Sequence, residues 1–328
     1  MQRRELFRFI AGLAATWPLA LRAQKSPIVI GFLAGQAPPP SQPNDAQYNA
    51  LMQGFQDNGL TLGRDFLFEP RFAGGDDDRF PELARELAQL NARIILANTP
   101  AGARAAQRLN PPVPVLITLM NDPVGAGLIT SLAHPGNHTT GTASLNEDVT
   151  PKLLEFLREI VPNAASLAVL FNPLNPTNPV ILENLRAKAQ LAGITLFPHS
   201  LKPRDDLDSL FLALAAQRPD ALQVIGDPAI GDLRGHLVAR ALVLGLPIFS
   251  TSSIVAEAGG LISYGAPVNR MLSRMGYYVK RILDGAKPDD LPVEQPTEVA
   301  LIINLRTAKA LGIEISPTLL ARADQVIE

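Results

Sequence analysis

The chain has 328 residues, of which 47% are hydrophobic and 18% are charged. This length allows two ordinary domains, and the composition excludes an intrinsically disordered chain. The formal net charge of -2 gives no reason to expect binding to nucleic acid or to an anionic membrane surface.

The first predicted element is a secretory signal peptide over residues 1–23. A basic segment with Arg3 and Arg4 comes first, an apolar stretch over residues 9–21 follows, and Ala23 is a small residue suited to the position before a cleavage point. This order of segments is typical of export signals, and the paired arginines resemble a twin-arginine signal. The apolar stretch is too short to cross a hydrocarbon core of ~30 Å.

The sequence contains no cysteine. A lipid-anchored exported protein needs a cysteine at its cleavage site, so we expect a free periplasmic protein and not a lipoprotein. Disulfides cannot stabilise its fold. No later apolar run is long enough to span a membrane, so we expect the mature chain not to be membrane-embedded.

From Ile28 onward, short apolar runs alternate with amphipathic stretches. Strands are predicted at residues 28–33, 65–69, 93–97 and 113–119. The helices between them are predicted at residues 44–59, 81–90 and 101–109. Nearly continuous apolar strands that alternate with helices indicate a parallel sheet covered by helices on both faces.

The same rhythm starts again after Thr142. A helix capped by Thr150 comes first, and the further helices are predicted at residues 179–192, 205–216 and 232–244. Strands are predicted at residues 166–171, 194–197, 221–225 and 247–249. Two α/β lobes of similar length are therefore favoured over one long sheet.

The C-terminal part of the chain complicates this division. A long amphipathic helix at residues 268–283 and a strand at residues 299–303 would lack partners if the second lobe ended near residue 265. We therefore predict that the chain crosses between the lobes more than twice. The first lobe would comprise residues 27–143 and about 266–296, and the second would comprise residues 144–265 and about 297–328.

Catalytic motifs are absent from the sequence. It contains no Gly-x-Ser-x-Gly elbow, Walker loop or Gly-x-Gly-x-x-Gly fingerprint. The four histidines are not at metal-ligand spacing. The acidic run at residues 76–78 directly precedes a predicted helix, whose dipole favours such charges. We therefore expect no enzyme activity, no metal and no cofactor.

Polar residues followed by proline recur where predicted strands end. They are Asn98 and Thr99, Asn121 and Asp122, Asn172, and Asp227. Ligands of open α/β sheets bind beyond the carboxyl ends of the strands. Turn and cap roles account for each residue taken singly, but the repetition in both halves predicts a shared cleft. Asp122 and Asp227 would hold a cationic group, and Thr99 and Ser252 a carboxylate.

Many segments resemble ABC-transporter substrate-binding proteins of the tryptophan/tyrosine type. The segments are RRE at 3–5, WPLA at 17–20, RAQ at 22–24, IGFL at 30–33, NDPV at 121–124, LAHPGN at 132–137, TG at 140–141, NP at 172–173 and 175–176, EAGGL at 257–261, SYG at 263–265, DLPVEQPT at 290–297 and AKALG at 308–312.

The resemblance implies a type I periplasmic-binding-protein fold, in which two doubly wound parallel-sheet lobes are joined by a multi-crossover hinge. It also implies an ABC permease and its ATPase as partners. The ligand-binding positions that it implies are Gly35, Gln36, Asn98, Thr99, Asn121, Asp122, Asn172, Asp227 and Ser252.

The ligand itself is not defined by the sequence. Three successive prolines begin at Pro38, and serines and a threonine occupy residues 250–253, where family members often carry an aromatic or charged residue. Aromatic residues make up 5% of the chain, and Trp17, its single tryptophan, lies in the signal peptide. An amino-acid-like molecule and a small organic acid both fit.

We therefore predict an exported, monomeric solute-binding protein that closes around a small molecule without transforming it. Its hinges are expected near residues 142–145, 263–266 and 296–299. A ligand-sensing domain for a membrane receptor is the first alternative, and a secreted α/β enzyme is the second.

Overall fold

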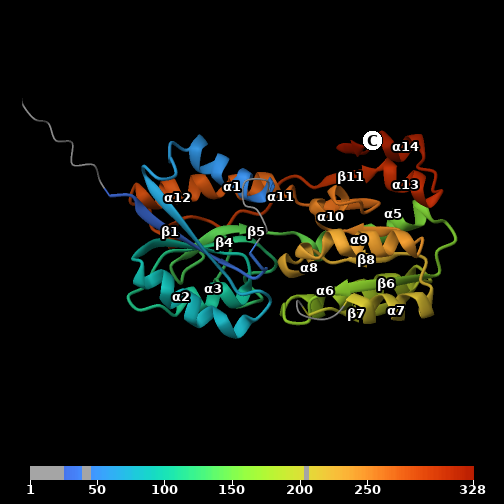
Figure 1. The fold of residues 1–328 in the computed structure, drawn as a ribbon, viewed down its shortest axis with the longest axis horizontal. Helices are drawn as coiled ribbons and strands as arrows, with labels where there is room; N and C mark the ends of the chain where they lie inside the picture. Colours follow the sequence, from blue (N-terminus) through green and yellow to red (C-terminus); the bar gives the residue numbers. More distant parts are fainter. Residues whose placement is uncertain (1–25, 39–45, 203–206) are drawn as a thin grey trace, which may run out of the picture.

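The computed structural model describes residues 26–38, 46–202 and 207–328. The predicted signal peptide, most of the proline run and the start of the first predicted helix lie outside these ranges. The described chain forms two α/β lobes that lie side by side, each built around a mainly parallel sheet (Figure 1). The predicted fold class is confirmed.

The first lobe contains a five-stranded parallel sheet in the order β2-β1-β3-β4-β5. Its strands are β1 Ile28–Ala34, β2 Phe66–Phe72, β3 Ala92–Ala97, β4 Val115–Met120 and β5 Thr139–Ala143. Its helices are α1 Ala46–Asp57, α2 Phe80–Gln89, α3 Pro100–Gln107, α11 Val268–Ser273 and α12 Met275–Leu283, with short 3-10 turns at Asp77–Arg79 and Pro288–Asp290.

Both faces of this sheet are covered, which explains the continuous apolar runs of its strands. Ile94 and Leu96 pack with α1, α11 and α12, whereas Ile95 and Ala97 pack with α2 and α3. Successive side chains of a strand point to opposite faces. A strand that is buried on both faces must therefore be apolar at every position.

The second lobe contains a seven-stranded sheet in the order β12-β11-β10-β9-β8-β6-β7. Its strands are β6 Ser166–Phe171, β7 Thr195–Ser200, β8 Leu222–Val224, β9 Ile248–Ser250, β10 Ile262–Gly265, β11 Ala300–Asn304 and β12 Gln325–Ile327. Its helices are α4 Asn146–Val149, α5 Lys152–Ile160, α6 Asn178–Leu191, α7 Leu207–Gln217, α8 Pro228–Asp232, α9 Arg234–Val243, α10 Ser253–Glu257, α13 Leu305–Leu311 and α14 Pro317–Leu320.

The chain crosses between the lobes three times, after β5, after β10 and before β11. The first and third crossovers lie side by side, because Thr142 pairs with Glu294 and the Ala143 amide donates to the Glu294 carbonyl at 2.8 Å. The third crossover enters the second sheet from the end where β10 leaves it. β11 must therefore run antiparallel to β10, as the pairing of Ile262 with Ile303 shows.

Three local predictions differ from the structure. The helix predicted at residues 268–283 is divided at Arg274 into α11 and α12. Thr150 ends the short helix α4 instead of capping α5, which begins at Lys152. The stretch predicted as one helix at residues 232–244 is preceded by a separate helix, α8, that ends at Asp232.

The helices α11 and α12 lie next to α1 (Figure 1) and contact it closely. A Cβ added at Gly54 would lie 2.1 Å from the Ser273 carbonyl oxygen, and one added at Gly276 would lie 1.9 Å from the Gly54 carbonyl oxygen. The Ser273 hydroxyl donates to the Ala50 carbonyl at 2.9 Å. Two glycines therefore allow α11 and α12 to pack on the first lobe.

We predict that Gly54→Ala lowers the free energy of unfolding by at least about 1–3 kcal/mol, because the added methyl group overpacks this contact. Urea denaturation measures the change. Gly235→Ala is the matched control: this glycine is exposed on α9 with no atom within 4 Å of an added Cβ. The control should be neutral or stabilising by up to about 1 kcal/mol. Equal stability of the Gly54 variant and the parent would contradict the packing described.

Candidate functional site

A cavity of about 170 Å³ lies between the two lobes. Cavities of about 150 Å³ accommodate a benzene-sized molecule, so there is room for a small organic ligand. The first lobe contributes its β1, β2 and β4 ends and α1. The second lobe contributes α4, α8 and the segments that follow β8 and β9. Lining side chains come from both lobes, so a ligand here would contact both.

The first-lobe wall is aromatic. Phe32, Tyr48, Phe68 and Phe72 line the cavity. The rings of Phe32 and Phe68 are stacked, with centroids 6.0 Å apart, and the Tyr48 ring lies 6.0 Å from Phe68. Such a surface favours an apolar, planar ligand group.

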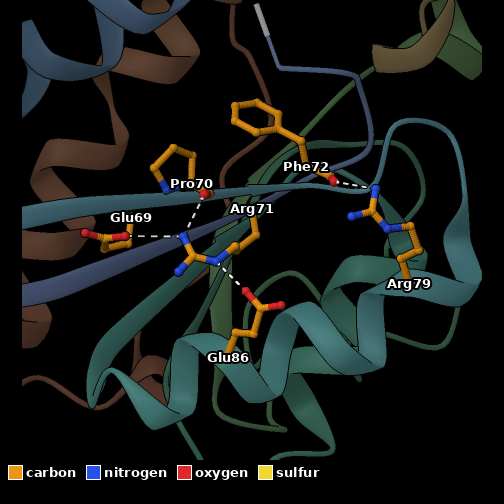
Figure 2. Close-up of polar contacts among 6 residues, drawn as sticks. All are labelled: Glu69, Pro70, Arg71, Phe72, Arg79 and Glu86. Atoms are coloured by element: carbon orange, nitrogen blue, oxygen red, sulfur yellow. Dashed lines mark hydrogen bonds and ion pairs between the residues drawn. The ribbon is translucent and has the colours of Figure 1, made fainter.

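The strand β2 positions this wall through alternation. Phe68, Pro70 and Phe72 are every second residue and share one face. Figure 2 shows the rings of Pro70 and Phe72 on one side of β2 and the Arg71 side chain on the other, where it reaches α2. Arg71 donates to Glu86 at 2.7 Å and to Glu69 at 3.2 Å. The pair with Glu86 joins β2 to α2 behind the cavity, whereas the pair with Glu69 lies within β2.

The end of β2 is held by a second arginine. The Arg79 guanidinium donates to the Phe72 carbonyl at 3.2 Å (Figure 2) and to the Ala73 carbonyl at 3.1 Å. The backbone next to Phe72 is therefore fixed, and the acidic residues 76–78 lie in the turn that this arginine closes.

The second-lobe wall contains an oriented carboxylate. Asp227 follows β8 and accepts hydrogen bonds from the side-chain amides of Asn172 at 3.1 Å and Asn175 at 3.2 Å. Asn172 is 8% exposed, and its own Oδ1 accepts from the Leu174 amide at 3.0 Å. Asn172 thus positions Asp227, which lines the cavity. A carboxylate held in this way can bind a cationic ligand group.

The polar residues of the first lobe divide into lining and supporting positions. Gln36 and Asn98 line the cavity and share a hydrogen bond of 2.7 Å. The Gly35 amide donates to Asn98 Oδ1 at 2.9 Å. Thr99 Oγ1 caps α3 by accepting from the Gly102 amide at 3.1 Å. Gly35 and Thr99 therefore lie behind the lining residues.

The remaining sequence-predicted residues lie in two different cavities. Ser252 lines the interlobe cavity in the second lobe. Asn121 and Asp122 line a different cavity of about 100 Å³. The backbone turns sharply between the two cavities, with φ of 51° at Leu119 and 33° at Asp122. Leu119 faces the interlobe cavity and Asp122 the smaller one.

The sequence reasoning missed the aromatic wall, although a signal was present. Phe66 and Phe68 alternate along the strand predicted at residues 65–69. Tyr48 lies in the helix predicted before it, at residues 44–59. The low overall aromatic content does not reveal that these rings lie together in one wall of the cavity. Arg234 and Asn146, which also line the cavity, carried no motif.

The lobes approach each other closely in this structure. The Ala37 amide of the first lobe donates to Asp232 Oδ2 of the second at 2.9 Å. Burial raises the pKa of the Asp77 carboxyl, and the carboxylates of Asp227, Asp78 and Asp76 raise it further. Asp77 and Asp227 belong to different lobes. Their proximity makes the cleft edge electronegative, which favours cationic ligand groups.

Within residues 26–38, 46–202 and 207–328, no cluster of three or more His, Cys, Asp or Glu side chains is arranged to hold a metal ion. Over the same ranges, no helix combines the length and apolar character that a membrane span needs.

The chain is similar to proteins of known class. A family model described as ABC transporter substrate binding protein matches residues 40–327. A curated protein from Clostridioides difficile (strain R20291), named tyrosine-binding protein, is 23% identical over 271 residues, which are 82% of this chain and 77% of the relative.

Two solved structures share the fold. A conserved domain protein from Vibrio cholerae superposes with a TM-score of 0.79 at 26% identity, over 92% of this chain and 100% of that one. An ABC domain in complex with L-Trp from Streptococcus pneumonia superposes with a TM-score of 0.80 at 24% identity, over 92% and 100%. Both likenesses cover the two lobes together.

We predict that Asp77→Asn raises the melting temperature at pH 7. When folding raises the pKa of a carboxyl, the protein loses stability as pH rises from the unfolded-state pKa to the folded-state pKa. Below the unfolded-state pKa, the carboxyl costs the protein no stability. The gain over the parent should therefore shrink as pH falls through the raised folded-state pKa and should be gone below about 4, close to the ordinary aspartate pKa.

Thermal unfolding followed by circular dichroism between acidic and neutral pH measures this difference. Glu257→Gln is the matched control, because Glu257 is exposed and is not among the carboxylates that raise the Asp77 pKa. A variant at Asp77 that is less stable than the parent at pH 7, or a gain that grows on acidification, would contradict the assignment.

Proposed function

Because the chain belongs to the ABC transporter substrate binding protein family, a family of solute-binding proteins and not an enzyme class, we propose that it delivers a small molecule to an ABC importer. The ligand would be amino-acid-like or a small organic acid. Its partners would be an ABC permease and its ATPase. The protein would act as a monomer in the periplasm after export by its twin-arginine-type signal.

One observation carries the ligand class: the interlobe cavity combines an aromatic wall in one lobe with an oriented carboxylate in the other. An aromatic amino acid offers a ring for the first and an α-amine for the second. The names of the relatives, which include a tyrosine-binding protein and a complex with L-Trp, support this choice.

Binding would proceed by closure of the lobes about the three crossovers. A ligand that contacts Phe68 in one lobe and Asp227 in the other is held fully only when both walls are close together. It therefore binds the closed state more tightly and shifts the population towards that state. The cationic group would also offset the repulsion between Asp77 and Asp227 on closure.

The ligand class is tested by mass spectrometry of the small molecules released when the purified protein is denatured. An aromatic amino acid recovered intact supports the proposal. Recovery of a chemically converted product after incubation with the same molecule would instead favour a secreted enzyme. A small acid without a ring or an amine would overturn the aromatic amino acid, and a molecule that is neither amino-acid-like nor a small organic acid would overturn the ligand class.

We predict that Asp227→Ala weakens binding of L-tyrosine or L-tryptophan by about 1.5–3 kcal/mol, because a charged hydrogen bond to the α-amine is lost. Phe68→Ala should also weaken it, because the ring loses its stacking partner. Isothermal titration calorimetry measures both effects.

The control is Glu257→Gln, which removes an exposed carboxylate that does not line the cavity and should leave affinity unchanged. Parental affinity in both site variants would remove these residues from the ligand site.

A further inference from the structure

A second cavity, of about 100 Å³, lies where the crossovers meet. Its walls come from three separate segments: the turn after β4 with Asn121 and Asp122, the first crossover with Ser144, and the third crossover with Gln295. The helix α4 adds Glu147. This site is distinct from the interlobe cavity, although Ser144 lines both.

The side chains lining this cavity give it negative charge. Asp122, Glu147 and Asp148 all line it, and among the described lining residues there is no Lys, Arg or His. Burial raises the pKa of the Glu147 carboxyl, and the carboxylates of Asp122 and Asp148 raise it further. Without a cation, these three carboxylates repel one another at neutral pH.

The backbone is shaped to hold the Asp122 carboxylate in place. Asp122 has a φ of 33°, in the left-handed region, and its Oδ1 accepts from the Gly125 amide at 2.8 Å. A Cβ at Gly125 would lie 1.8 Å from Asp122 Oδ2. A strained residue and a required glycine thus position an acidic group against the cavity, and strain of this kind is concentrated at functional sites.

An unpartnered amide gives an independent indication of a ligand. Asn121 lines the cavity and is 7% exposed. Its Oδ1 accepts from the Ser144 hydroxyl at 3.1 Å, whereas its buried Nδ2 has no hydrogen-bond partner in the described part of the chain. A buried donor without an acceptor is costly. A ligand that carries an oxygen acceptor would satisfy it.

From these observations we propose that the crossover cavity binds a small organic ammonium ion that also carries an oxygen acceptor. The ammonium group bonds the carboxylates of Asp122 and Glu147, and the oxygen accepts from Asn121 Nδ2. The cavity is smaller than the ~150 Å³ that accommodates benzene, so the ligand has the size of ethanolamine. The proposal does not depend on the identity of the interlobe ligand.

The test uses ethanolamine as the probe and ethylamine, which lacks the oxygen, as its analogue. Calorimetric titration of the full purified protein should show saturable binding of ethanolamine and, at saturation, a higher melting temperature. Ethylamine should bind at least about threefold more weakly, because it leaves Asn121 Nδ2 unsatisfied. Asn121→Ala should abolish the difference between the two amines.

Charge-removing variants locate the site. Glu147→Gln and Asp122→Asn should each weaken ethanolamine binding at least about tenfold, because a charge-assisted hydrogen bond is lost. Circular dichroism establishes whether each variant is folded. If one of the two variants does not fold, the other alone tests the site. The exposed Glu257→Gln should bind ethanolamine as the parent does.

Absence of saturable ethanolamine binding by the parent protein would overturn the proposal. Parental affinity in the folded Glu147 and Asp122 variants would do the same. Loss of ethanolamine binding in Asp227→Ala with parental affinity in Glu147→Gln would assign the amine to the interlobe cavity, and would also overturn it.

Discussion

The packing of α11 and α12 against α1 is the contact on which the rest of the architecture depends. Gly54 and Gly276 allow the helix backbones to approach directly, which holds a late part of the chain on the first lobe. The chain must then leave the second lobe after β10 and return to it before β11. The three crossovers, the antiparallel entry of β11 and the lining of the cavity by Val268 and Leu272 all follow from this contact.

The two faces of the interlobe cavity offer different kinds of contact to a ligand. Apolar rings on β1, β2 and α1 lie opposite Asp227, whose orientation is fixed by Asn172 and Asn175. The electronegative cleft edge at Asp77 adds a reason for the lobes to separate when the site is empty. A ligand with a ring and an amine would cover the apolar wall and place a positive charge beside Asp227. Under the proposed function, recognition and closure would therefore depend on the same groups.

Much of the fold was predictable from the sequence, because buried parallel strands contain continuous apolar runs, such as residues 94–97 and 167–171. The extra crossings were also inferred, from a helix and a strand that lacked partners. The strands β5, β10 and β12 were missed. The polar residues of β5, Thr139–Ala143, are buried by packing, and none of the three strands has a long apolar run. The division of the helix at Arg274 depends on contact with α1, which no local pattern contains.

The site was less predictable than the fold. The polar residues after strands were found, since the topology places strand ends at one edge. The sequence could not show that Asp122 faces a second cavity, because a register shift between β4 and β5 and the left-handed turn at Leu119 redirect the chain. Nor could it show that Thr99 caps α3 instead of lining the cavity. Both outcomes depend on backbone geometry over a few residues.

The central claim, that the lobes close around an amino-acid ligand, is tested most directly by a distance measured across the cleft. The chain has no cysteine, so Gln89→Cys on α2 and Ala187→Cys on α6, both exposed, can be spin-labelled selectively. Double electron–electron resonance should show a broad distribution of distances between the two labels without ligand. With L-tyrosine or L-tryptophan, the distribution should be narrower and its distances shorter. An unchanged distribution in protein that calorimetry shows to be saturated would contradict the account.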